Sequence, residues 1–220
     1  VGDIESQPFL ESIRQFQHEV GHDNAILIHV TLIPYLSASQ ELKTKPTQAS
    51  VKDLQGMGIQ PDIIVCRSEH PLDQSIKDKV ALFCNVDENA VVQSIDMPTI
   101  YEVPLRMQEQ GLDVTILQKM GLPVGETPTL GPWRDFLDRR HKATEKVKIG
   151  LVGKYDLQDA YKSILEALSQ AATYNDRKAD IHFINSEKLT DANVEEQIKD
   201  MDGIIICPGF GQRGIEGKFV

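Results

Sequence analysis

The chain contains 220 residues, of which 40% are hydrophobic and 25% charged, a composition typical of globular proteins with one or two domains. Its 33 acidic and 23 basic residues give a formal net charge of −10. This charge excludes a long nucleic acid as the expected partner, because proteins that bind one usually present a net basic face. No apolar run reaches the length of a membrane span, so we expect no membrane partner.

The three cysteines, Cys66, Cys84 and Cys207, are far apart and form no CxxC pair, which argues against a disulfide framework or a cysteine zinc site. Each closes a short apolar run, so we expect buried thiols at strand ends in a reducing compartment, the cytoplasm. The chain begins without methionine and stops shortly after a loop. We therefore expect it to be an internal piece of a longer protein.

The first half predicts helices alternating with strands. Ser6, as a side-chain cap, and Pro8 begin a helix that Gly21 ends. The apolar, β-branched residues 25–33 predict a buried strand. Further elements follow in chain order: a helix over 48–57, a strand over 62–66, a helix before the next strand, and strands over 80–84 and 90–95.

Residues 121–146 are punctuated by proline and glycine and predict a linker that carries one short helix around Trp133 and Leu137. A second alternation follows, with strands over 148–152, 179–184 and 203–207 and helices over 159–172 and 192–201. Strands that alternate with helices predict an α/β fold with parallel sheets. We therefore expect two parallel-sheet α/β units, joined by the Pro/Gly-rich linker.

Two short motifs suggest other chemistry. His18 and His22 stand in an HExxH pattern, which in a zinc protease lies on one continuous helix. Gly21 predicts a helix end there, so we favour a solvated helix terminus, and we expect no metal ligands in the chain. Residues 209–214 match GxGxxG after a predicted strand. The dinucleotide fingerprint belongs to the first βα turn of its unit, however, and this match follows the third strand. A glycine-rich turn and an oxyanion hole both remain open for it.

One cluster has the composition of a phosphate site. Residues 43–48, with the sequence KTKPTQ, hold two lysines, two threonines and a glutamine in a turn that leads into a helix. Lysines neutralise phosphate, while hydroxyl groups and a helix N-terminus donate to its oxygens. The residue types alone fit a nucleoside triphosphate site and a solvated turn with a threonine cap equally well.

A resemblance to the CTP synthase family separates these possibilities. It rests on several motifs that follow the family's order and spacing: GDIES at 2–6, KTKPTQ at 43–48, GIQPD at 58–62, CRS at 66–68, Lys79, ALFCNV at 81–86, GLVGKY at 150–155, DAYKS at 159–163 and PGFGQRGIEG at 208–217. The resemblance implies the end of a P-loop-ligase-like amidoligase domain over 1–122, a linker over 123–146, and the Rossmann-like start of a glutamine amidotransferase domain over 147–220.

The resemblance also implies the activity: ATP-dependent amination of UTP to CTP, with ammonia released from glutamine. UTP, or CTP as feedback inhibitor, would be bound by Asp3, Ile4, Glu5, Lys43, Thr44, Lys45, Pro46, Thr47, Gln48 and Lys79. Ile95, Asp96 and Met97 would border the adenine of ATP, Gly209 would help to form the oxyanion hole for glutamine, and Arg213 and Glu216 would lie where a GTP-responsive lid begins. The family also implies Mg2+ with ligands outside this chain, GTP as allosteric activator, and a tetramer.

The family's phosphate loop and glutaminase nucleophile have no counterpart in these residues, so we expect no catalytic residue here and no activity of the chain alone. Three alternatives remain open at this point. They are an NAD-dependent oxidoreductase fragment, from the GxGxxG match; a zinc hydrolase, from His18 and His22; and a non-catalytic nucleotide-binding or assembly module.

Overall fold

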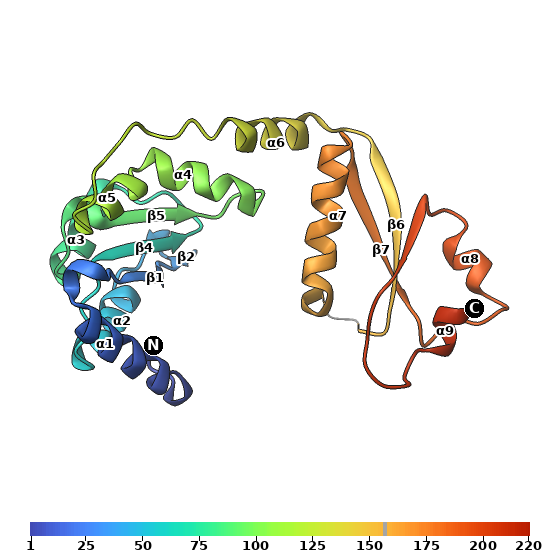
Figure 1. Ribbon diagram of the computed structural model, residues 1–220, viewed down its shortest axis with the longest axis horizontal. Helices are drawn as coiled ribbons and strands as arrows, with labels where there is room; N and C mark the ends of the chain where they lie inside the picture. The colour runs from blue at the N-terminus through green and yellow to red at the C-terminus, as the bar shows by residue number, and fades with distance from the viewer. Residues whose placement is uncertain (156–157) are drawn as a thin grey trace. The chain divides into compact units, whose positions relative to one another are not determined.

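The computed structural model describes residues 1–155 and 158–220. Within them the chain forms two compact units, Val1–Thr127 and Pro128–Val220, and Figure 1 labels the helices and strands of each. Each unit has its own sheet and core. The two units are therefore described one at a time.

The first unit is an α/β sandwich. Its elements in chain order are η1 (Ile4–Ser6), α1 (Gln7–Val20), η2 (His22–Asn24), β1 (Ile28–Leu32), β2 (Tyr35–Leu36), β3 (Glu41–Leu42), α2 (Lys45–Gly56), β4 (Ile63–Ser68), α3 (Gln74–Cys84), η3 (Glu88–Ala90), β5 (Val91–Ile95), η4 (Ile100–Glu102), α4 (Val103–Glu109) and α5 (Leu112–Lys119). Strands β1, β4 and β5 form a parallel sheet in the order β1-β4-β5, and β2 and β3 form an antiparallel pair.

The central strand β4 separates two hydrophobic layers, because alternate side chains of a strand point to opposite faces. Ile64 and Cys66 face α2 and α3, where they pack with Val51 and Val80. The residues between them face the other way, and α4 and α5 cover that side (Figure 1), with Val65 in the second cluster. A near-continuous apolar strand such as β4 is expected where both faces of a parallel sheet are covered.

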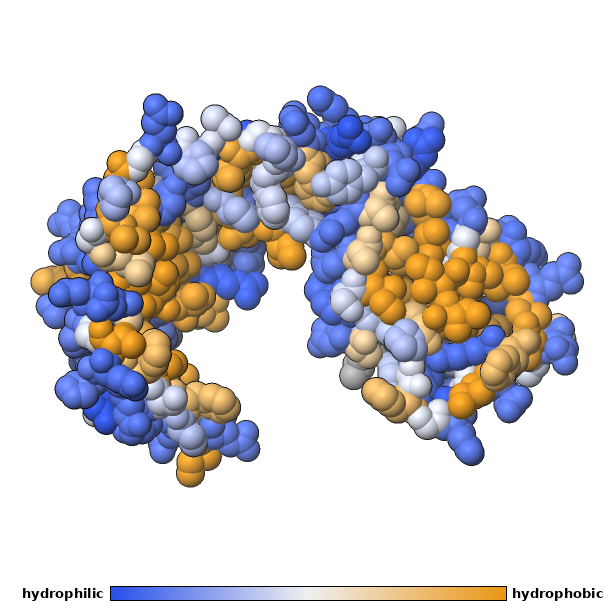
Figure 2. Space-filling model, viewed as in Figure 1, coloured by the Kyte–Doolittle hydropathy of each residue, from blue (hydrophilic) through white to orange (hydrophobic). Residues whose placement is uncertain are grey.

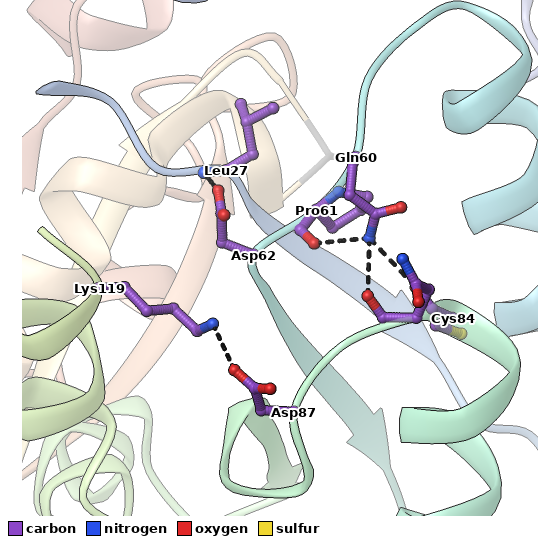
Figure 3. Close-up of polar contacts among 8 residues, drawn as sticks. Leu27, Gln60, Pro61, Asp62, Cys84, Asp87 and Lys119 are labelled. Carbon is purple, nitrogen blue, oxygen red and sulfur yellow. Dashed lines mark hydrogen bonds and ion pairs between the residues drawn. The ribbon is translucent and has the colours of Figure 1, made fainter. Parts of the chain in front are cut away.

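Polar contacts hold the amino ends of the strands (Figure 3). The Asp62 carboxylate accepts from the Leu27 backbone N–H at 2.7 Å, which ties the start of β4 to the start of β1. The Gln60 amide donates to two carbonyl oxygens at the end of α3, both at 3.2 Å. Lys119 on α5 pairs with Asp87 at 2.9 Å. The amino end of the sheet is thus tied by side chains, and the carboxyl end is where a ligand site is expected in such folds.

The second unit contains α6 (Gly131–Lys142), β6 (Lys146–Gly153), η5 (Gln158–Tyr161), α7 (Lys162–Tyr174), β7 (Lys178–Asn185), α8 (Val194–Ile198), β8 (Gly203–Ile206) and α9 (Glu216–Phe219). Its parallel sheet has the order β7-β6-β8. Leu151 of β6 packs on the α7 side and Val152 on the α8 side. Helix α6 packs against the C-terminal end of α7, with the rings of Phe136 and Tyr174 5.5 Å apart.

Apolar side chains also lie on the surface of both units. In β1, Val30 is 64% exposed, and its neighbours on the same face are exposed as well. Figure 2 shows hydrophobic atoms gathered over the sheet of the second unit, where Ile204 and Ile206 of β8 are exposed. The prediction that residues 25–33 form a buried strand is therefore wrong in its burial, because only one side of β1 is covered, by α2.

The predicted α/β class with parallel sheets is confirmed, but several local predictions need correction. Residues 80–84 are not a strand: they are the last turns of α3, so Cys84 is buried at a helix end. Ser6 does not cap a helix with its side chain, which donates instead to the Asp3 carbonyl at 2.7 Å. Helices α4 and α5 were not predicted. Helix α8 is five residues long, shorter than the ten expected over 192–201.

Candidate functional site

The carboxyl ends of β1, β4 and β5 lie along one edge of the first sheet, since the three strands are parallel. The connections that leave this edge contain two of the segments singled out in the sequence. Residues 43–48 follow β1 by way of the β2–β3 pair, and residues 95–97 lie at the end of β5. In open α/β sheets, ligands bind outside the carboxyl ends of the strands. The topology therefore brings both segments to the edge where a nucleotide site is expected.

The short β2–β3 hairpin carries the chain from β1 to the first turn of α2. The Lys43 backbone N–H donates to the Pro34 carbonyl at 2.9 Å, which closes this hairpin. Helix α2 then begins at Lys45, three residues earlier than predicted, with Pro46 in the first turn, where a missing N–H costs nothing. The KTKPTQ segment thus forms the N-terminus of a 12-residue helix, whose positive dipole end favours an anion.

Thr47 is 1% exposed and ties this helix to the sheet. Its hydroxyl hydrogen-bonds the Thr31 hydroxyl and donates to the Leu32 carbonyl at 3.1 Å. The Gln48 amide donates to the Thr44 hydroxyl at 3.1 Å, across one turn of the helix. The Thr47 hydroxyl is therefore used by the fold, whereas Thr44, 5% exposed, and the half-buried Gln48 bond each other in the first turn of the helix. Sequence reasoning missed Thr31, a buried hydroxyl within an apolar strand.

Lys43, one of the lysines of the predicted site, pairs with a neighbouring carboxylate. Lys43 forms an ion pair and hydrogen bond with Glu41. The pKa of Glu41 lies below its ordinary value, first because Lys43 donates to it and then because Ser39 donates to it, with a smaller contribution from the charge of Lys79. Lys45 is exposed at the first position of α2. The structure thus pairs Lys43 with Glu41, a residue that the sequence did not suggest, while the charge of Lys79 contributes only weakly to the lowered pKa of Glu41.

Residues 3–5 lie elsewhere in the unit. Asp3 accepts a hydrogen bond from the Glu5 backbone N–H at 3.1 Å, at the start of η1, and Ile4 is exposed. In the part of the chain that the structure describes, no hydrogen bond or ion pair joins residues 3–5 to residues 43–48.

A cavity of about 260 Å3 lies beside the end of β5. Its lining includes Ile95 and Met97 of the predicted adenine segment, together with Gln93, Arg106, Glu109 and Gln110. Asp96, the middle residue of that segment, contacts β4 instead of the cavity lining. Its carboxylate pairs with Arg67 at 3.2 Å, and its N–H donates to the Ser68 carbonyl at 3.1 Å. The predicted adenine segment thus borders a mixed polar and apolar hollow of the kind that small ligands occupy.

In the second unit, the glycine loop follows β8 at the carboxyl edge of that sheet. A side chain at Gly209 would place its Cβ 2.8 Å from Cε of Lys154. Lys154 cannot move aside freely, because it is 4% exposed and its ammonium donates to the Phe210 carbonyl. Gly209 is therefore required by close approach, and its N–H remains available for the oxyanion role that the family resemblance implies. Lys154 was not predicted as a site residue.

The rest of this loop is folded against Ser186, at the end of β7. A Cβ at Gly214 would lie 2.5 Å from the Ser186 hydroxyl, and one at Gly217 would lie 1.8 Å from its carbonyl oxygen. Arg213 pairs with Glu187, next to Ser186. Glu216 is the first residue of α9.

The alternative metal site is not formed. His18 lies in α1 and His22 in η2, with Gly21 at φ 85° between them, so the continuous helix of a zinc protease is missing. Within residues 1–155 and 158–220, no group of three His, Cys, Asp or Glu residues is arranged to hold a metal ion. None of the helices described combines the length and hydrophobicity that crossing a bilayer requires.

Comparison with known proteins identifies the family of this chain. The family described as CTP synthase N-terminus matches residues 1–122. CTP synthases of Bacteroides thetaiotaomicron and Bacteroides fragilis are each 70% identical over all of this chain, and that of Porphyromonas gingivalis is 59% identical over all of it. The chain spans 41% of the length of each of these relatives. The chain belongs to the CTP synthase family.

Proposed function

We propose that this chain is part of a glutamine-hydrolysing CTP synthase, which uses ATP to activate the 4-oxygen of UTP and ammonia from glutamine to displace the phosphate. The observation that carries the proposal is the position of residues 43–48 at the N-terminus of α2, where Lys43 pairs with Glu41. This group lies on the same sheet edge as residues 95–97. A reaction between two nucleotides requires that both bind close together, and a triphosphate site and an adenine site at one sheet edge meet that requirement.

The lysines and the first turn of α2 would hold the UTP triphosphate. Lys43, Lys45 and Lys79 supply positive charge, and Thr44 and Gln48 supply hydrogen-bonding groups at the helix end. Glu41 neutralises Lys43 when no phosphate is present. Thr47 holds the helix on β1 and would act on the ligand only through that position. CTP would compete for the same triphosphate groups as a feedback inhibitor.

Residues 3–5 would complete the UTP site together with residues 43–48, partly across a subunit interface, as the family resemblance implies. This arrangement accords with the tetramer implied by the family. ATP would lie beside residues 95–97, and its Mg2+ would take ligands from other parts of the full-length protein. The three buried, unpaired thiols support a cytoplasmic location.

In the second unit, Gly209 would donate its N–H to the oxyanion formed as glutamine is hydrolysed. Lys154 would keep that backbone in place through the Phe210 carbonyl. Arg213 and Glu216 would belong to the region that responds to GTP. The nucleophile and the phosphate loop would be supplied outside residues 1–220, so we expect the isolated chain to form no CTP.

The test is CTP formation by the full-length protein that contains this segment, from UTP and ATP, with glutamine or ammonium as nitrogen donor. Lys45→Ala should raise the KM for UTP about 10- to 100-fold with either donor, because a charge-assisted contact is worth about 1.5–3 kcal/mol. Lys52→Ala is the matched control, since Lys52 is an exposed lysine further along the same helix. Equal KM values in the two variants would remove the lysine group from the UTP site.

The same assay separates the remaining alternative, a non-catalytic nucleotide-binding or assembly module. Such a module would bind UTP, measured by calorimetry, and would form no CTP with either nitrogen donor. A protein that forms CTP with ammonium but not with glutamine would support the role of the first unit and contradict the role given to Gly209.

A further inference from the structure

The open edge of β5 is closed by a single side chain, Gln110, at the junction of α4 and α5. Its amide oxygen accepts from the Gln93 backbone N–H at 2.9 Å, and its amide nitrogen donates to the Gln93 carbonyl at 2.8 Å. The same nitrogen donates to the Arg106 carbonyl, in the last turn of α4, at 3.0 Å. The side-chain amide thus makes the two bonds to Gln93 that a neighbouring strand would make.

The geometry of β5 explains why Gln93 needs such a partner. The backbone groups of successive residues in a strand point alternately to its two sides. The Asp96 N–H donates to Ser68 of β4, so the even-numbered residues face β4, and Gln93 and Ile95 face the open edge. β5 is the last strand of its sheet. Without Gln110, the Gln93 backbone would have no partner in the sheet.

Gln110 also separates two hollows along this edge. One is the cavity lined by Ile95, Met97 and Gln110, and the other, of about 300 Å3, is lined by Val91, Gln110 and polar residues of α3 and η3. The next outward-facing backbone after Gln93 is that of Ile95, at the first of these cavities. Gln110 therefore fixes the backbone of Gln93, two positions before Ile95, whose backbone faces the candidate adenine pocket.

Gln93 is held from its side chain as well. Its amide oxygen accepts from the Leu72 backbone N–H at 2.9 Å, which anchors it to the connection between β4 and α3. Among the described residues, only Gln110 binds the main chain of Gln93 to the α4–α5 region. The junction itself is shaped by Gly111, which has φ 73° and directs the chain from α4 into α5.

We propose that Gln110 is a positioning residue for ATP: its amide replaces a neighbouring strand at the edge of β5 and fixes the backbone of residues 95–97 against the adenine. The inference rests on the proposed function, because it takes residues 95–97 as the adenine segment. Gln110 touches no reacting atom. It acts through the strand, so its loss should weaken ATP binding without slowing the chemical step.

The experiment compares Gln110→Met and Gln110→Glu with Gln118→Met in the full-length protein. Methionine keeps the length of the side chain and removes all its hydrogen bonds, while glutamate keeps an acceptor for Gln93 and loses both donated bonds. Gln118 is an exposed glutamine on α5 and serves as the control. Three quantities are measured: the Kd for ATP by calorimetry, the kinetics with ammonium, and hydrogen exchange over residues 93–97.

Both Gln110 variants should raise the Kd and KM for ATP about tenfold, as expected if only a tenth of the molecules keep the binding-competent segment. The kcat and the KM for UTP should stay within about twofold, and exchange over 93–97 should accelerate. Two results would overturn the inference. Faster exchange with an unchanged Kd for ATP would show that Gln110 has only a structural role, and unchanged exchange with an unchanged Kd would show that it does not fix the strand. A wild-type protein that forms no CTP contradicts the proposed function instead, and the ATP Kd, which needs no turnover, then decides the role of Gln110.

Discussion

Thr47→Val should loosen the first turn of α2 and weaken UTP binding. The Thr47 hydroxyl is buried and has two partners, the Thr31 hydroxyl and the Leu32 carbonyl. Valine has nearly the same shape, so the change removes both hydrogen bonds without opening a cavity. At about 1 kcal/mol for each bond, the expected cost is roughly 2 kcal/mol, because the partners stay buried.

A double-mutant cycle measures this free-energy cost and shows how much of it comes from the hydrogen bond between the two threonines. Thr31→Val, Thr47→Val and the double variant are compared by hydrogen exchange of α2 amides, which reports local opening in a protein with several domains. If the hydroxyls bond each other, the double variant should cost about 1 kcal/mol less than the sum of the single variants. Thr144→Val, at an exposed threonine, should change nothing. Additive effects, or a cost for Thr47→Val no larger than for Thr144→Val, would refute the reasoning.

Three further predictions test the loop, the thiols and the lysine group. Gly217→Ala should abolish glutamine-dependent CTP formation and leave the ammonium-dependent rate unchanged, because the new Cβ would lie 1.8 Å from the Ser186 carbonyl oxygen. Gly125→Ala is the control: a Cβ there has no neighbour within 4 Å, so both rates should stay unchanged. Burial raises the pKa of Cys66 to about 12, so iodoacetamide at pH 8 should label it only after unfolding, as peptide mapping would reveal. Glu41→Gln should lower the KM for UTP, because the paired lysine no longer has a competing carboxylate; a higher KM would contradict that role.

The error at residues 80–84 shows what a short apolar run cannot specify. VALFC is apolar and short enough for a buried strand, and periodicity cannot distinguish such a run from a buried helix segment. The helix is fixed by features further away: Asp73 caps it by accepting from the Ile76 N–H at 2.8 Å. Within the run, Leu82 and Phe83 are exposed while Val80 is buried. That pattern follows a helix face, and it becomes visible only once the packing is known.

The burial of β1 was misjudged for a different reason. Its residues are β-branched and apolar, as in a strand covered on both sides, yet Val30 faces outward on an edge strand. The composition of a strand indicates which of its residues can be buried. The position of the strand in its sheet determines which of them are buried in the folded protein. The order β1-β4-β5 arises from pairing between distant segments, and the sequence pattern of one strand contains no information about it.

The candidate site was predictable in its location and not in its internal contacts. Alternating strands and helices predict a parallel sheet, and a parallel sheet places the turns after its strands, with residues 43–48 and 95–97, along one edge. The side chains that fix those turns come from elsewhere: Thr31 holds Thr47 from within a strand, and Gln110 holds Gln93 from a helix junction. Neither has a motif of its own, because each is defined by a partner that only the fold brings near. Variants of these two supporting residues should therefore change nucleotide affinity, although neither belongs to a recognised motif.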